Sequence, residues 1–168
     1  MPKIDLERPL AEPAVPAREA ASHILKDIAA DANVWQGFAL HLNLGALGLP
    51  DVGYIAIPVR LEIAGEETEP RHQISFTIHA RRSAEVFPVF HGALGVDSSG
   101  PSSSQVWLAG EYELPMSGLG AFFDKAVARN AAAKTLENFL TDLVEAVAAR
   151  IEKRELAQAR YRLFGAGA

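Results

Sequence analysis

The feature that most constrains this chain is a long amphipathic segment in its last third. Residues 119–160 place apolar side chains at intervals of three and four, which is the spacing of one helical face. The charged side chains of the same stretch fall on the opposite face. The pattern therefore predicts one long helix whose apolar stripe is covered by the rest of the chain. The stripe consists of Phe122, Phe123, Ala126, Val127, Ala133, Leu136, Leu140, Leu143, Val144, Val147 and Ile151.

Upstream of this helix, most of the chain alternates between apolar and polar residues, as half-buried strands do. Pro58 interrupts one of these segments and favours an edge or bulged strand there. The strands are predicted at residues 3–10, 38–44, 54–63, 73–82, 86–96 and 105–114. Turns are predicted at 45–53 and 65–70, and the run DSSGPSSS at 97–104 predicts a polar hairpin loop.

One further helix is predicted near the N-terminus, from Arg18 to about residue 33, with Pro16 close to its start. The order is thus a short strand, a helix, about five strands joined by turns, and the long helix. Consecutive strands joined by turns indicate an antiparallel sheet, and its apolar face needs the helix as a cover. The fold class is α+β. A length of 168 residues is typical of a single domain, which we place at 1–168.

Composition excludes several classes of function. The chain has no cysteine, which rules out disulfides, zinc–thiolate sites and thiol nucleophiles. Its net charge of −5 argues against a nucleic-acid partner, because phosphate binding needs a basic face. No run of about 18 apolar residues and no signal-peptide pattern is present, so we expect a cytoplasmic protein without a membrane span.

The second half of the chain resembles the START-like (SRPBCC) helix-grip superfamily of bacterial polyketide cyclases and lipid-transport-like proteins. The resemblance rests on VFPVFHGALGV at 86–96, VWLAGEYELPMSGLG at 106–120, the FDK run that begins at Phe123, and TLENFL at 135–140. It implies a curved antiparallel sheet of six to seven strands wrapped around the C-terminal helix, with a hydrophobic cavity between them. The superfamily includes carriers, receptors and enzymes, so the resemblance specifies a fold more than an activity.

The histidines offer little chemistry. There are five, and none has the His-x-His or His-x-x-x-His spacing of a metal site, so we predict no metal and no cofactor. His91 is the one that we retain as a candidate, since the glycines and proline of its strand could form a bulge that turns it inward. There, Glu85, Arg81 or Glu111 could act with it as an acid–base pair. The alternative is a solvated polar face.

Tyr112 is in phase with the inward residues of its strand, so its ring should be buried while its hydroxyl needs a partner. That partner is a ligand or, as is commoner for a buried tyrosine, the protein backbone. Gly110 beside it removes a side chain from the inner face. We therefore predict a ligand site lined by Phe76, Ile78, Phe90, His91, Leu108, Tyr112, Phe123 and Val127.

Three functions remain open at this point. The first is binding of an apolar or amphipathic small molecule between the sheet and the C-terminal helix. The second is a polyketide cyclase or dehydratase, in which Tyr112, His91 or Arg60 polarises a carbonyl. The third is a protein–protein module, such as a homodimer, that uses the outer sheet face and an exposed Trp107. We favour the first, because the strand phases direct only Tyr112 inward among polar groups. The phenylalanines could also fill the cavity themselves.

Overall fold

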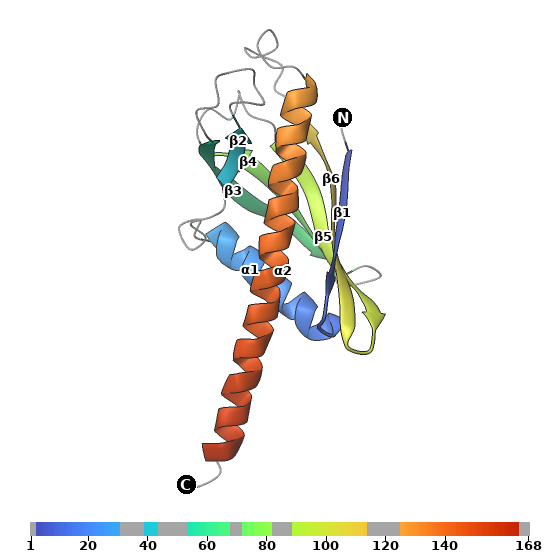
Figure 1. Cartoon of the computed structure of the whole chain (residues 1–168), viewed down its shortest axis with the longest axis vertical. Helices are drawn as coiled ribbons and strands as arrows, with labels where there is room; N and C mark the ends of the chain where they lie inside the picture. Colours follow the sequence, from blue (N-terminus) through green and yellow to red (C-terminus); the bar gives the residue numbers. More distant parts are fainter. Residues whose placement is uncertain are drawn as a thin grey trace.

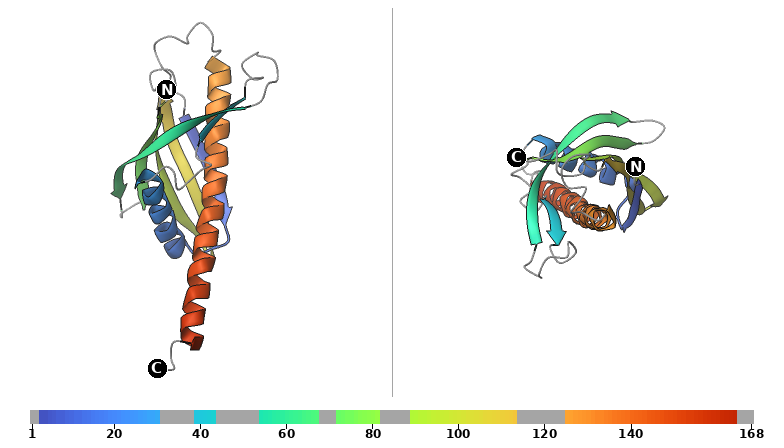
Figure 2. Two further views of the ribbon diagram at one scale, coloured as in Figure 1. Left: turned by 90° about the vertical axis from the view of Figure 1, so that its left-hand side faces the viewer. Right: turned by 90° about the horizontal axis from the view of Figure 1, so that it is seen from above.

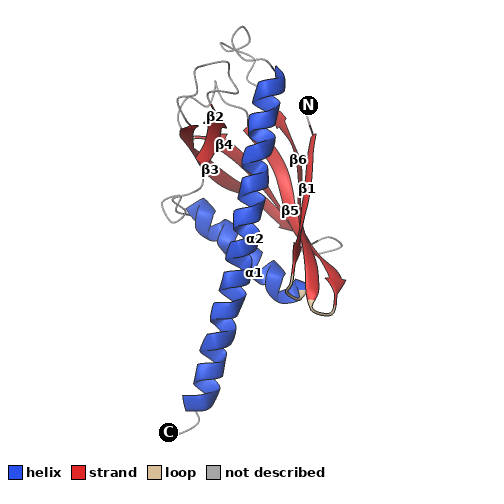
Figure 3. Ribbon diagram, viewed as in Figure 1, coloured by secondary structure: helices blue, strands red, loops and turns tan. Residues whose placement is uncertain are grey.

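The computed structural model describes residues 3–30, 39–43, 54–67, 72–81, 89–113 and 125–164. Helices and strands both occur in these ranges, which confirms the predicted α+β class (Figures 1 and 3). The order is β1 (Lys3–Leu10), α1 (Ala14–Ala30), β2 (Ala39–Asn43), β3 (Tyr54–Glu67), β4 (Gln73–Ala80), β5 (Val89–Gly100), β6 (Ser103–Glu113) and α2 (Lys125–Phe164).

The strands pair in the order β1-β6-β5-β4-β3-β2, and every pair is antiparallel. Five of them, from β1 to β3 in this order, form one continuous open sheet. The strand β2 adds only a short ladder to the first part of β3, where Ala39 to Asn43 lie opposite Pro58 to Tyr54. The predicted sheet of six to seven strands is therefore not confirmed for the described part of the chain.

Pro58 lies where β3 changes its pairing partner. The segment that ends at Pro58 pairs with β2, and the segment from Val59 onward pairs with β4. Proline has no N–H to donate to a ladder, so this junction suits it. The β3–β4 register also shifts between Ile63 and Gly65, as at a β-bulge, which bends the strand. The strand then runs to Glu67, so the turn predicted from residue 65 begins later.

The β5–β6 hairpin is longer than the sequence predicts. The predicted loop at 97–104 is mostly strand, because β5 continues to Gly100 and β6 begins at Ser103. Asp97 pairs with Gln105, and the turn itself is only Pro101 and Ser102. Serine, glycine and aspartate have low strand propensity. Here the partner strand supplies their backbone hydrogen bonds, and this long-range pairing overrides the local preference.

Both helices bury the stripe that their periodicity predicts. Helix α1 begins at Ala14 instead of Arg18, because Pro16 is accommodated in a first turn, where its missing N–H is not needed. Helix α2 runs to Phe164, and the predicted positions 119–124 lie outside the described residues. The buried side chains of its stripe are Leu136, Leu140, Leu143, Val147 and Ile151.

The sheet curves around α2, as the view from above shows (Figure 2, right). Helix α1 contacts α2 together with β3, β5 and β6, and α2 also contacts β1 and β2. The core lies between the two helices and the inner face of the sheet. Past Ile151, α2 projects beyond the sheet (Figure 1), and its described side chains from Glu152 to Arg162 are all exposed. Among the described helices, neither has the combination of length and apolar character needed to cross a membrane.

Candidate functional site

The inner face of the sheet presents buried apolar side chains in rows across the strands. One row joins Leu61, Ile78, Phe90 and Tyr112, which are direct cross-strand partners on β3, β4, β5 and β6. All four are buried. They share a face because side chains alternate along a strand and the register between these strands is regular here. We call these four residues the inner row.

Next to the inner row, two glycines lie directly opposite each other. Gly92 of β5 pairs with Gly110 of β6, so neither strand places a side chain here. The ring of Phe90 occupies the space. A Cβ added at Gly92 would lie 2.4 Å from the Phe90 Cζ atom, and one added at Gly110 would lie 2.7 Å from it. The gap that the sequence predicts at Gly110 is therefore closed by the Phe90 ring together with backbone atoms of β5.

Three phenylalanines continue this packing toward α2. The ring centroids of Phe76 and Phe90 are 6.0 Å apart, with their planes at 51°. Phe139 of α2 lies on the other side, with its centroid 6.4 Å from that of Phe76 and its plane at 64°. Tilted and edge-on pairs at these distances are favourable aromatic contacts. The rings thus connect the sheet to the long helix.

Five of the eight predicted site residues lie in this core. Phe76, Ile78, Phe90, Leu108 and Tyr112 are all buried and belong to one hydrophobic cluster. Their strand phases predicted this placement. Whether they contact a ligand stays a prediction. Two other predicted members, Phe123 and the side chain of Val127, lie outside the described part of the chain.

His91 lies on the opposite, outer face of the sheet. It is exposed, and its Nδ1 atom is 3.2 Å from the Thr77 hydroxyl in a hydrogen bond. An inward His91 required a bulge in β5, but the register is regular from Val89 to Ser98 and shifts only after that. Glu111 is its cross-strand partner on the same outer face, so a pairing of the two would not lie in the core.

Trp107 also lies on the outer face, where it is half-buried instead of exposed. Its cross-strand partner is Gly95, and a Cβ at Gly95 would meet the indole ring at 2.3 Å. The indole therefore covers a glycine of the neighbouring strand. This contact explains a tryptophan at this position by packing within the sheet, and the homodimer remains a prediction.

Polar groups are scarce in the described core. Its buried side chains carry two hydroxyls, those of Tyr112 and Ser104. Ser104 lies at the far end of β6, opposite Leu10 and Ser98, and its Oγ has no hydrogen-bond partner among the described residues. No three His, Asp or Glu side chains come together as metal ligands within the same described ranges.

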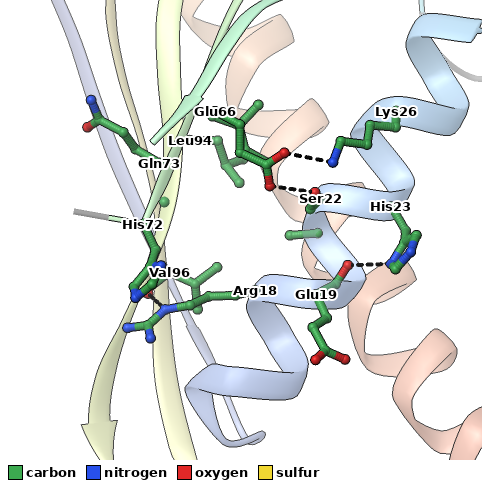
Figure 4. Close-up of a pocket in the computed structure, with 13 residues that line it drawn as sticks. Arg18, Glu19, Ser22, His23, Lys26, Glu66, His72, Gln73, Leu94 and Val96 are labelled. Atoms are coloured by element: carbon green, nitrogen blue, oxygen red, sulfur yellow. Dashed lines mark hydrogen bonds and ion pairs between the residues drawn. The ribbon is translucent and has the colours of Figure 1, made fainter. Parts of the chain in front are cut away.

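A pocket that the sequence did not predict lies between α1 and the sheet. This pocket of about 240 Å³ has an apolar floor and a charged rim (Figure 4). Its floor is formed by Ala21 of α1 with Ile74, Leu94 and Val96 of the sheet. Its rim includes Arg18, Ser22, Lys26, Glu66 and His72. We call it the α1 pocket.

The rim of the α1 pocket contains a short chain of polar contacts. Lys26 Nζ lies 2.6 Å from one carboxylate oxygen of Glu66, and the Ser22 hydroxyl donates to the other at 2.9 Å. These two hydrogen bonds, that of Lys26 first, lower the pKa of Glu66 from its usual value of 4.5. The positive charges of Lys26 and His23 add to the effect, and burial opposes it. Glu66 is therefore held as a carboxylate.

Comparisons with known proteins give structural likeness without close sequence relatives. No family model matches the sequence, and no curated protein matches it. A conserved protein from Geobacillus kaustophilus is similar in structure, with a TM-score of 0.54 at 10% identity over 88% of this chain and 96% of that one. At this identity the likeness concerns the fold alone.

Two further solved structures have lower scores. The Zhui aromatase/cyclase from Streptomyces sp. R1128 gives a TM-score of 0.48 at 13% identity, over 99% of this chain and 98% of that one. A norcoclaurine synthase point mutant from Thalictrum flavum gives 0.44 at 13% identity, over 82% and 95%. The described part of the chain forms an antiparallel sheet curved around a long C-terminal helix, which is the arrangement that the sequence resemblance implies. The chain has a START-like helix-grip fold.

Proposed function

We propose that this protein binds a hydrophobic or amphipathic small molecule between the inner face of the sheet and α2. The single observation that carries the proposal is the inner row with its neighbouring glycine pair. Together they form an apolar surface with one phenol, that of Tyr112, at its β6 end. Apolar walls with few polar groups are typical of small-molecule sites.

The glycine pair gives the ligand a place to lie. Gly92 and Gly110 place no side chain on the inner face, and the ring of Phe90 lies over both, beside backbone atoms of the paired strands. A phenylalanine side chain can change rotamer as a unit. In our proposal Phe90 covers the glycine pair in the free protein and turns aside for the ligand, whose apolar body then packs against Phe76 and Ile78.

Tyr112 supplies the polar contact in this proposal. Its ring is the cross-strand neighbour of Phe90, so a ligand over the glycine pair would lie within reach of the phenol. A phenolic hydroxyl can both donate and accept a hydrogen bond. An amphipathic ligand with a carbonyl or hydroxyl at one end would therefore be preferred over a pure hydrocarbon. We propose binding without catalysis, because the described buried residues offer Tyr112 and the distant Ser104 as their only hydroxyls.

Native mass spectrometry tests the proposal first, followed by organic extraction and mass analysis of what is released. We expect a mass above that of the polypeptide, and a lipid, fatty acid or aromatic metabolite in the extract. A bare polypeptide mass, with no saturable binding of an offered fatty acid or naphthyl dye, would mean that the core is closed by its own side chains.

Variants then locate the ligand. Tyr112→Phe keeps the ring and removes the hydroxyl, and it should weaken an amphipathic ligand roughly fivefold, the equivalent of about one hydrogen bond. A pure hydrocarbon should be unaffected by this change. His91→Ala is the matched control, because His91 is exposed on the outer face. Loss of binding in His91→Ala with retention in Tyr112→Phe would place the ligand on the outer face and contradict the proposal.

A further inference from the structure

Arg18 holds its guanidinium group in a fixed orientation at the α1 pocket. Its Nε atom donates to the backbone carbonyl of Val96 at 2.8 Å, and the side chain is half-buried. Figure 4 shows Arg18 reaching from α1 toward β5, with its guanidinium drawn at the same end of the pocket as His72. Since the Nε is engaged, the two terminal nitrogens remain for other contacts.

Those terminal nitrogens have no partner among the described residues, while the neighbouring charges are already paired. Glu66 is bound by Lys26 and Ser22. The carboxylate of Glu19 accepts from Arg154 of α2 at 2.7 Å. Both acids on the described rim are thus neutralised by other cations. The positive charge of Arg18 is not balanced within the described part of the pocket.

The pocket behind this charge is apolar. Leu94 and Val96 are almost fully buried, at 1% and 2% exposure, and Ala21 and Ile74 complete the floor. A guanidinium fork matches the geometry of a carboxylate, whose two oxygens can each accept one N–H. The volume of about 240 Å³ is below the roughly 300–1,000 Å³ of sites for drug-sized ligands. The occupant must therefore be small.

We propose that the α1 pocket is a second binding site, which takes a small carboxylate with a short apolar chain. The carboxylate binds end-on to the two terminal nitrogens of Arg18, beside His72, and the chain lies on Leu94 and Val96. The site does not depend on the proposed function of the inner row, since it is formed by α1 and the opposite end of the sheet.

NMR titration of the labelled full-length chain with hexanoate tests this site directly. We expect amide shifts in residues 18–26, 72–74 and 94–96. Acetate should bind more weakly than hexanoate, because each buried methylene contributes up to about fourfold in affinity. Inorganic phosphate should also bind more weakly, since it has the charge without the chain. Shifts confined to the surroundings of Phe90 and Tyr112 would assign hexanoate to the inner row and overturn the α1 site.

Two arginine variants and a control separate the fork from charge alone. Arg18→Met should lower hexanoate affinity at the α1 pocket at least about tenfold. Arg18→Lys keeps the charge without the fork and should give an intermediate loss. Arg60→Met removes the same charge from the outer face, where Arg60 is exposed, and should leave binding unchanged. Equal losses in Arg18→Met and Arg60→Met, or none in either, would overturn the proposal. Circular dichroism shows whether each variant is folded. If Arg18→Met does not fold, the hexanoate affinity of Arg18→Lys decides the outcome.

Discussion

The ring of Phe90 lies over Gly92 of its own strand, so close that a methyl group on the glycine would come within 2.4 Å of the ring. The same ring covers Gly110 across the ladder. One aromatic side chain therefore substitutes for two missing ones at the centre of the sheet. On the outer face Trp107 does the same for Gly95. The β5–β6 hairpin thus lacks a side chain at three positions, Gly92, Gly95 and Gly110. The rings of Phe90 and Trp107 cover these positions.

Gly110→Ala should destabilise the protein strongly. The new Cβ would meet the His91 carbonyl oxygen at 2.4 Å and the Gly92 Cα at 2.6 Å. These are backbone atoms, which cannot move aside without disturbing the hairpin. We expect a loss of roughly 1–3 kcal/mol in the free energy of unfolding, measured by urea denaturation. Gly65→Ala is the control, because nothing lies within 4 Å of a Cβ there, and it should cost little. Equal losses for both variants would contradict the packing described.

Phe90→Ala should cost about 3–5 kcal/mol as a large buried ring is removed. Its combination with Gly92→Ala is more informative. The Cζ of Phe90 is the nearest obstacle to a Cβ at Gly92, although the Ala109 carbonyl also lies within 2.8 Å. The cost of Gly92→Ala should therefore fall by about 1 kcal/mol in the Phe90→Ala background, since directly contacting residues couple. Strict additivity in this double-mutant cycle would show that the ring does not pack on Gly92.

Trp107→Ala distinguishes packing from an interface. Because the indole lies on Gly95, its removal should lower the free energy of unfolding by about 1–3 kcal/mol, less than for a fully buried ring. The molar mass by light scattering should not change. A lower mass in the variant than in the wild type, with the thermal midpoint intact, would instead support a homodimer through the outer face.

The Lys26–Glu66 contact should make stability sensitive to acid. The pKa of Glu66 is lowered in the folded state, chiefly by the hydrogen bond from Lys26. The stabilising contribution is therefore complete above the unfolded pKa and is lost as the pH falls through the folded pKa. Lys26→Met should raise the Glu66 pKa toward 4.5 and reduce the loss of stability below that pH. A carboxyl NMR titration measures the shift. Lys134→Met, on α2, should leave the pKa of Glu66 unchanged.

The alternation of apolar residues predicted the inner row because burial on one face requires a period of two. This period places Ile78, Phe90 and Tyr112 on the inner face of their strands without any information about which strands pair. The same rule predicts His91 outward. Our hypothesis of an inward His91 relied on a bulge that glycine and proline make plausible, whereas the register shift occurs after Ser98. A sequence indicates that a bulge is possible, but its position depends on the pairing of both strands.

The α1 pocket could not be predicted from sequence because its contacts are distant along the chain. Arg18 occupies a polar position of a helix, where an arginine is ordinarily solvated. Its partner is a backbone carbonyl, that of Val96, and every residue has one. The Lys26–Glu66 contact likewise joins a helix to a strand through two unremarkable charges. Only the packing of α1 across the sheet brings these groups to one rim.

Because α2 projects past Ile151, it has two parts. The first part unfolds together with the core, and the second part can unfold separately from it. Between Leu136 and Ile151 one face of the helix is buried, so the amides of this part open only when the core is disrupted. Beyond Ile151 every described side chain is exposed, so that segment is stabilised by its own backbone hydrogen bonds and by exposed contacts such as Arg154 with Glu19. A helical segment that is held mainly by its own backbone hydrogen bonds frays from its free end. Hydrogen exchange along α2 should therefore rise stepwise at Ile151, and the step marks the boundary where tertiary structure ceases to hold the helix.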